Sequence, residues 1–244
     1  MQNRYTGDIG DFSKLGLLRA LQASGLSIGV NWYLVVPDET HNDDGRYVQY
    51  LENADFRSCD ETLWLELKRI VSSGQREVAA LQNAHLLNGP FYSDPLSFSG
   101  KTKAERIALR EEWHRAALDT LSEAEIVFVD PDNGLLVPSA AGTRKENKFV
   151  TPDELAAYYK QGSSVVYYQH KARMPDFVYA DRHRELIRSS GFEGASGSGL
   201  KFTKTPLRYY FFAVQPKHKA VIDDLVARIP DTAWGKLFRP LDLQ

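Results

Sequence analysis

The sequence lacks most of the features that would place it in a specialised class of protein. It contains a single cysteine, Cys59, so an intramolecular disulfide and a zinc site of four thiolates are both excluded. No run of apolar residues approaches the roughly 20 that a membrane-spanning helix needs, and the first residues contain no apolar signal segment. We therefore expect a cytoplasmic protein with no membrane partner.

An excess of charge of one sign is also missing. The chain has 30 Lys and Arg against 32 Asp and Glu, for a net charge of −2, so it has no global basic field to attract nucleic acid. A local basic patch remains compatible with this composition. The sequence also lacks the signatures of P-loop hydrolases, Rossmann dinucleotide-binding enzymes, zinc proteases and serine hydrolases.

The order of the expected elements indicates an α/β protein. With 244 residues, 43% of them hydrophobic, the chain can bury the core of one large domain. From residue 28 onward strands alternate with helices, which predicts a Rossmann-like, three-layer sandwich with a mostly parallel central sheet and helices on both faces. The expected strands are 28–36, 125–130, 164–169 and 208–214, and the expected helices are 12–23, 60–72, 103–122, 152–160, 177–190 and 217–228.

We expect residues 1–244 to form a single domain with a helical insertion at about 52–122. The glycines and hydroxyl residues of 193–205 are typical of a mobile loop. The sequence predicts no particular oligomeric state.

The segment IVFVDPDNGLL, residues 126–136, places polar side chains at the end of a hydrophobic strand. Pro131 forces Asp130 into an extended conformation, and Asn133-Gly134 favours a tight turn. Because ligands of open α/β sheets bind beyond the carboxyl ends of the strands, Asp130, Asp132 and Asn133 are candidate catalytic residues. His170 ends the expected strand 164–169, so it is a fourth candidate at the same edge.

Two further polar segments are expected to reach this edge. YTGDIGDFSK, residues 5–14, has Asp8 in a glycine-containing loop before an apolar helix, and Asp11 is the expected N-cap of that helix. DETHNDDGRY, residues 38–47, follows the first strand with several groups that could act as oxygen ligands for a divalent cation, although a solvated loop is the more common outcome for such a segment.

These segments together resemble the bacterial 23S ribosomal RNA adenine-N6 methyltransferases, a family with a Rossmann-like class I methyltransferase fold. The resemblance is carried by Gly7-Asp8-Ile9-Gly10-Asp11-Phe12-Ser13-Lys14, by Thr40-His41-Asn42-Asp43-Asp44-Gly45-Arg46-Tyr47 and by Asp130-Pro131-Asp132-Asn133, which occur in the family's order. The last position of the third motif, an aromatic residue that stacks the target base in the family, is Asn133 here.

The resemblance implies S-adenosylmethionine-dependent methyl transfer to a nucleic acid amino group. It implies that Lys14 contacts the cofactor and that Asp130 and Asn133 orient the target amino group. The residues expected to bind the cofactor are Asp8, Asp11, Lys14, His41, Asp43, Asp44 and Gly45, and those expected to act in catalysis are Asp130, Asp132, Asn133 and His170. No residue is assigned to a metal in this interpretation.

Two alternatives remain open at the level of sequence. In the first, Asp8, Asp11, Asp130 and Asp132 hold Mg²⁺ or Mn²⁺ in a nuclease or phosphodiesterase, with His170 or Lys148 near the scissile phosphate. In the second, the chain is a degenerate methyltransferase fold that acts as a binding module.

Overall fold

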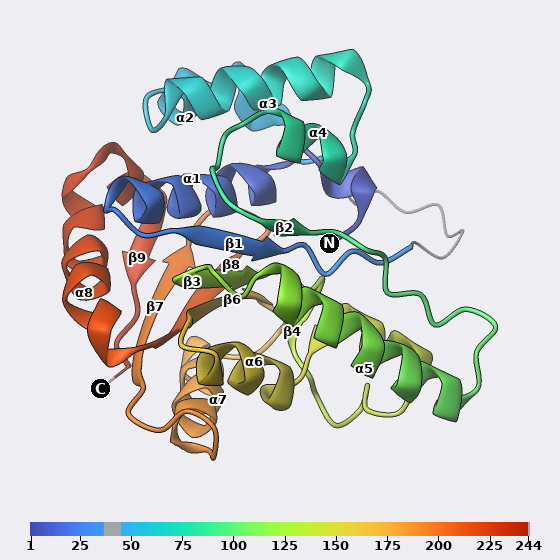
Figure 1. Cartoon of the computed structure of the whole chain (residues 1–244). Helices are drawn as coiled ribbons and strands as arrows, with labels where there is room; N and C mark the ends of the chain where they lie inside the picture. Colours follow the sequence, from blue (N-terminus) through green and yellow to red (C-terminus); the bar gives the residue numbers. More distant parts are fainter. Residues whose placement is uncertain (37–44, 244) are drawn as a thin grey trace.

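A computed structural model describes residues 1–36 and 45–243, and these residues form an α/β fold around one seven-stranded sheet (Figure 1). The strands lie in the order β2-β1-β3-β6-β8-β7-β9, and a separate two-stranded ladder joins β4 to β5. The strands are β1 (Ile28–Asn31), β2 (Phe91–Tyr92), β3 (Ile126–Val129), β4 (Gly134–Leu135), β5 (Phe149–Val150), β6 (Ser164–His170), β7 (Ser196–Phe202), β8 (Arg208–Val214) and β9 (Phe238–Pro240).

Most strands of the sheet run in one direction, as the alternation of elements predicts. β2, β1, β3 and β6 pair in parallel, whereas β8 is antiparallel to both β6 and β7. β7 therefore has the direction of β6, and β9 is antiparallel to β7. The carboxyl ends of β1, β3 and β6 consequently meet at one edge of the sheet, which we call the carboxyl edge.

Helices cover both faces of the sheet (Figure 1). They are α1 (Ile9–Ala23), α2 (Ala54–Arg57), α3 (Glu61–Ser73), α4 (Val78–Asn83), α5 (Lys103–Thr120), α6 (Pro152–Lys160), α7 (Asp176–Arg188) and α8 (Lys219–Arg228). Apolar side chains of α1, α3, α4 and α8 share one core with the sheet, and those of α5, α6 and α7 share a second core on the other face.

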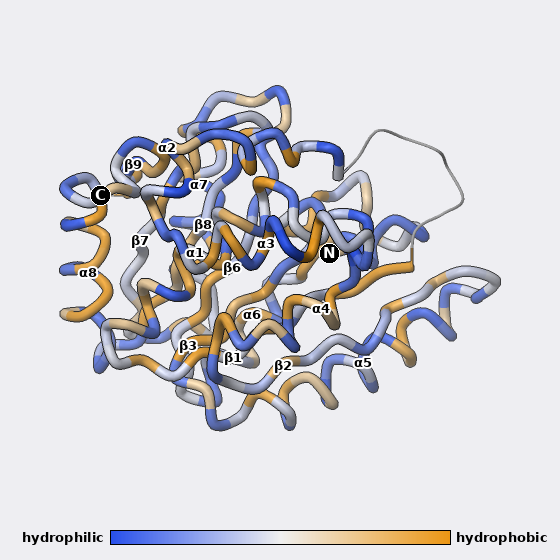
Figure 2. Tube along the Cα trace, turned by 90° about the horizontal axis from the view of Figure 1, so that it is seen from above, coloured by the Kyte–Doolittle hydropathy of each residue, from blue (hydrophilic) through white to orange (hydrophobic). Residues whose placement is uncertain are grey.

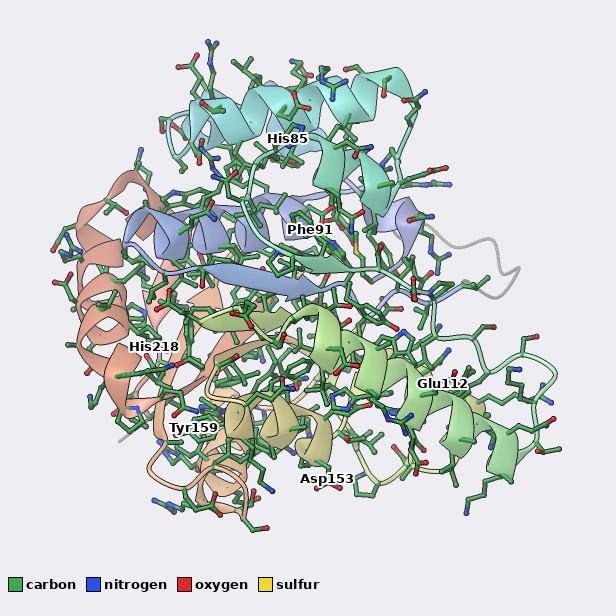
Figure 3. All side chains as sticks on the ribbon, viewed as in Figure 1. His85, Phe91, Glu112, Asp153, Tyr159 and His218 are labelled. Carbon is green, nitrogen blue, oxygen red and sulfur yellow. The ribbon has the colours of Figure 1, made fainter. Side chains whose placement is uncertain are left out.

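The amphipathic character of the outer helices follows from this layering. Hydrophobic and hydrophilic residues alternate along α8, so one side of that helix is buried while the other meets solvent (Figure 2). Side chains fill the space between the sheet and the helices on both faces (Figure 3). Among the described residues, none of the helices combines the length and the apolarity needed to cross a bilayer.

Several elements begin where the local sequence predicts. Thr151 caps α6 by accepting from the amide of Glu154, and Pro152 occupies the first turn, where its missing N–H costs nothing. Strand β8 coincides with the expected strand 208–214 and is buried throughout. The segment 52–122 contains helices, but it also contributes β2, which extends the sheet next to β1.

Two expectations were wrong. The expected loop 193–205 contains β7, which pairs with β8 and β9. Its glycines permit close packing, since a Cβ atom at Gly197 would lie 2.7 Å from the Ile187 side chain of α7. The first strand ends at Asn31, well before residue 36, because the Asn31 side chain accepts from the Tyr33 amide at 2.8 Å and Tyr33 turns to a left-handed φ of 48°.

Candidate active site at the carboxyl edge of the sheet

A cavity of about 510 Å³ lies at the carboxyl edge. Its walls come from the N-terminal segment between Met1 and Lys14, from Gly45 and Tyr47, from the turn Asp130–Asn133, and from the residues around Lys145 and Lys148. Tyr168 and His170 of β6 and Arg208 of β8 complete it. We call it the rim cavity. The N-terminus lies beside the arrowhead of β1, which brings segments far apart in sequence to this edge (Figure 1).

The turn after β3 is fixed by its neighbours on both sides. The Asp130 amide donates to the Asn31 carbonyl at 3.0 Å, so the ladder between β1 and β3 extends to the first residue of the turn. The Gln169 side chain of β6 fixes the end of the turn, because its Nε2 donates to the Asn133 carbonyl and its Oε1 accepts from the Leu135 amide, both at 2.9 Å. Gly134 has a φ of 101°, which favours glycine at that position.

Lys14 and two carboxylates form a buried ionic cluster beneath the rim cavity. The Lys14 ammonium pairs with Asp130 and with Asp11, the latter at 2.9 Å, and Lys14 is 4% exposed. Burial acts to lower the pKa of Lys14, but the charges of Asp11 and Asp130 outweigh it and raise that pKa. Burial raises the pKa of both carboxyls above their usual range, although Lys14 opposes the rise.

Asp8, not Asp11, is the N-cap of α1, which corrects the expectation from sequence. The Asp8 side chain accepts from the amides of Gly10 and Asp11 at 2.7 and 3.1 Å. The helix therefore begins at Ile9, and Asp11 falls within its first turn, where its carboxylate accepts from the Gly7 amide at 2.8 Å. This leaves Asp11 buried and facing Lys14 instead of capping.

The second carboxylate of the turn, Asp132, pairs with the amino group of Met1 at 2.9 Å. That amino group also donates to the Asp130 carbonyl at 2.8 Å. The Asn133 amide donates to the Lys148 carbonyl at 3.0 Å, which places the turn directly beside the basic segment Arg144–Lys148. Asn133 lines the cavity together with Lys145 and Lys148 of that segment, so its neighbourhood in the cavity is basic.

The lining of the rim cavity has the opposite charge balance to the chain as a whole. Among the described residues that line it, five cationic side chains face three aspartates, a difference of two positive charges, while the whole chain has a net charge of −2. The cationic residues are Arg4, Lys14, Lys145, Lys148 and Arg208, and the acidic ones are Asp8, Asp130 and Asp132. A local basic lining of this kind favours anionic ligands.

The structure brings most of the predicted site residues together. Asp130, Asp132, Asn133 and His170 line the rim cavity, as do Asp8, Lys14 and Gly45, whereas Asp11 lies buried beside Lys14. His41, Asp43 and Asp44 lie outside the described residues. His170 is also close to Tyr168, whose hydroxyl lies 3.3 Å from the His170 Nδ1.

Sequence reasoning missed three residues of this site. Arg208 precedes an apolar run, Gln169 lies in the expected strand 164–169, and Tyr47 ends the polar segment 38–47. Tyr47 is 46% exposed and presents an aromatic side chain to the rim cavity. The available signal was the position of Arg208 and Gln169, a basic and an amide residue at the ends of expected strands beside the predicted edge.

The four carboxylates of the alternative metal site are already engaged by protein groups. Asp8 caps a helix, Asp11 and Asp130 pair with Lys14, and Asp132 pairs with the Met1 amino group. Within residues 1–36 and 45–243, no group of three or more His, Cys, Asp or Glu side chains is arranged to hold a metal ion. These contacts give the nuclease interpretation no support.

A second cavity, of about 480 Å³, lies between α5 and α6. Its wall contains a structural ion pair in which Arg110 contacts Glu154 at 2.7 Å and Glu146 at 3.4 Å. Tyr33 donates to the same Glu154 carboxylate at 2.6 Å. Because the strand-end residues Asp130, Asn133 and Arg208 line the rim cavity and not this one, we regard the rim cavity as the candidate active site.

Comparison with known proteins adds no assignment, because no protein-family model and no curated protein matches the chain.

Proposed function

We propose that the chain is an S-adenosylmethionine-dependent methyltransferase that acts on an amino group of a nucleic acid. The observation that carries the proposal is the rim cavity itself, in which Lys14, Asp130 and Asn133 meet at the carboxyl edge of the sheet. Its volume of about 510 Å³ lies within the range of cavities that hold cofactors.

The sheet supports the proposal because it is the mostly parallel α/β sheet that the resemblance implies. β2, β1, β3 and β6 pair in parallel, and β8 lies between β6 and β7 and runs against both of them. In sheets of this kind the cofactor and the target meet beyond the carboxyl ends of the parallel strands. The rim cavity occupies that place.

The lining of the cavity suits a nucleic acid target. Lys145 and Lys148 lie beside the turn that contains Asn133, so they can contact phosphate groups while a base reaches Asn133. Tyr47 supplies an aromatic surface in the same cavity, although residue 133 is not aromatic. Enzymes that act on an extruded base commonly stack it on such a surface.

In this proposal the residues of the chain align the reactants. S-adenosylmethionine supplies an electrophilic methyl group when it is bound. The Asn133 side-chain oxygen accepts a hydrogen bond from the target amino group and directs its lone pair, while Lys14 and the Asn31 carbonyl hold Asp130 in a fixed position. Alignment of this kind can account for much of the rate enhancement of a methyl transfer.

Calorimetric titration with S-adenosylmethionine tests the proposal, with a parallel titration with Mn²⁺. We expect saturable binding of S-adenosylmethionine to the wild type and to Asn133→Ala. Transfer of a labelled methyl group to RNA should fall on the order of 100-fold in that variant, because one positioned hydrogen-bonding group is lost.

Asp223→Asn is the matched control, since Asp223 is an exposed residue of α8 that pairs with Lys219. It should bind cofactor and transfer methyl groups like the wild type. Absence of cofactor binding by the wild type would contradict the proposal. Mn²⁺ binding that is lost in Asp130→Asn would instead favour a metal-dependent nuclease.

A further inference from the structure

Arg208 is a buried cation of the rim cavity that has no carboxylate partner among the described residues. It begins β8, is 3% exposed and lines the cavity. Its Nε and Nη2 donate to the Pro206 carbonyl at 3.0 and 2.9 Å, and its guanidinium lies 5.6 Å from the centre of the Phe202 ring. A neutral carbonyl compensates only part of the cost of burying a guanidinium.

The other buried arginine of the fold shows a different pattern. Arg110 is 8% exposed, and it forms ion pairs with both Glu146 and Glu154. Burial acts to lower the pKa of Arg208, but Tyr168 and Tyr210, followed by Asp8 and Asp11, raise it. The Asp8 carboxylate accepts from the first amides of α1, and among the described residues no ion pair joins a carboxylate to Arg208. Arg208 therefore retains the capacity to bind an anion that enters the cavity.

Gly10 makes room for the Arg208 guanidinium. A Cβ atom at residue 10 would lie 2.1 Å from the Arg208 Nη1 and 2.7 Å from the Asp8 Oδ1. The first turn of α1 can therefore pass against the guanidinium only because residue 10 has no side chain. This close approach holds Arg208 in the wall of the cavity that also contains Asp130.

We propose that Arg208 is the anion-binding residue of the rim cavity and that it binds the carboxylate of the ligand. The guanidinium fork suits an anion with two oxygens in one plane, which it can contact through parallel hydrogen bonds. The assignment of that carboxylate to the methionyl part of S-adenosylmethionine rests on the proposed function. A nucleic acid phosphate is the other anion that presents two such oxygens to a guanidinium.

Two nucleosides that differ in the carboxylate distinguish these sources. S-adenosylhomocysteine has the amino acid group, whereas 5′-methylthioadenosine lacks it. We expect Arg208→Met to weaken binding of S-adenosylhomocysteine about 10- to 100-fold, as for the loss of a charge-assisted hydrogen-bonded pair, and to leave binding of 5′-methylthioadenosine unchanged. Arg208→Lys should have an intermediate effect because it keeps the charge and loses the fork.

Gly10→Ala should reproduce the loss by displacing the guanidinium, and it also serves as an independent test if Arg208→Met does not fold. Arg228→Met is the matched control, because Arg228 is an exposed arginine of α8 that pairs with Asp224. It should leave the binding of both nucleosides unchanged. Circular dichroism identifies the variants that are folded.

Binding of a single-stranded oligonucleotide, measured by fluorescence anisotropy, is the third measurement after the two nucleosides. If the anion is a phosphate, Arg208→Met weakens oligonucleotide binding and leaves both nucleosides unaffected, which supports the anion site and overturns its assignment to the cofactor. If the wild type binds neither nucleoside, the proposed function fails, and the oligonucleotide alone decides the role of Arg208. Equal affinity of folded Arg208→Met and wild type for all three probes overturns the inference, as does the absence of any binding to the wild type.

Discussion

Replacement of Lys14 by methionine tests the buried ionic cluster beneath the rim cavity. Lys14 is the cation between two carboxylates, and the side chains of Asp11 and Asp130 are 0% and 3% exposed. Removal of one partner of a buried pair typically costs about 3–5 kcal/mol, because the remaining charge is left without compensation. We expect Lys14→Met to lower the free energy of unfolding by about this amount, whereas Asp130→Asn should cost less because Lys14 keeps Asp11 as a partner.

The loss in Lys14→Met should depend on pH. Burial already raises the pKa of Asp11 and Asp130 above the usual value of 3.8, and removal of Lys14 removes an opposing influence. Between 3.8 and the raised folded-state pKa, the folded protein binds more protons than the unfolded chain, so its stability falls as pH rises through that window. The variant should therefore be less destabilised at pH 5 than at pH 8.

Urea unfolding followed by circular dichroism at both pH values measures these effects. Lys219→Met is the matched control, because the exposed pair between Lys219 and Asp223 should contribute less than about 1 kcal/mol. A loss in Lys14→Met no larger than the loss in Lys219→Met would refute the buried cluster. A loss that is the same at pH 5 and pH 8 would refute the effect of Lys14 on the two carboxyl groups.

Three further predictions concern the scaffold. Burial lowers the pKa of His183 to about 4, so stability should fall by about 1.6 kcal/mol from pH 6.5 to pH 5, and urea titrations of His183→Gln should show a shallower pH dependence. Glu154→Gln should cost about 1.5–3 kcal/mol, less than the loss of a sole partner because Arg110 keeps Glu146, with cofactor binding unchanged by calorimetry; a loss under about 1 kcal/mol would contradict this. Gly134→Ala should cost about 1–3 kcal/mol in thermal unfolding, since φ is 101° and a Cβ atom would lie 2.3 Å from Gln169; an unchanged midpoint would contradict it.

The local sequence contained enough information to predict the turn at the carboxyl edge. An apolar strand that runs into Asp130-Pro131 can be recognised from composition alone, and parallel strands must bring their carboxyl ends together. Asp8 and Asp130 accordingly line the same cavity, although 122 positions separate their residue numbers. The cap of α6 was equally predictable, because Thr151 and Pro152 act through their own backbone.

Features that depend on the identity of spatial neighbours could not be predicted in this way. Asp8 and Asp11 are chemically equivalent candidates for the N-cap of α1, and the choice depends on Lys14, which recruits Asp11 into the ionic cluster. The absence of a carboxylate partner for Arg208 among the described residues likewise becomes visible only when the surrounding elements are in place. Strand β7 was missed because its glycines, such as Gly197, are required by the packing of α7 and not by a loop.

A crystal structure of the protein soaked with S-adenosylhomocysteine would show whether the rim cavity is the active site. We expect ligand density in the rim cavity, with the carboxylate within hydrogen-bond distance of Arg208 and the sulfur facing the turn that contains Asn133. Density in the cavity between α5 and α6, or an empty rim cavity at saturating ligand concentration, would contradict it.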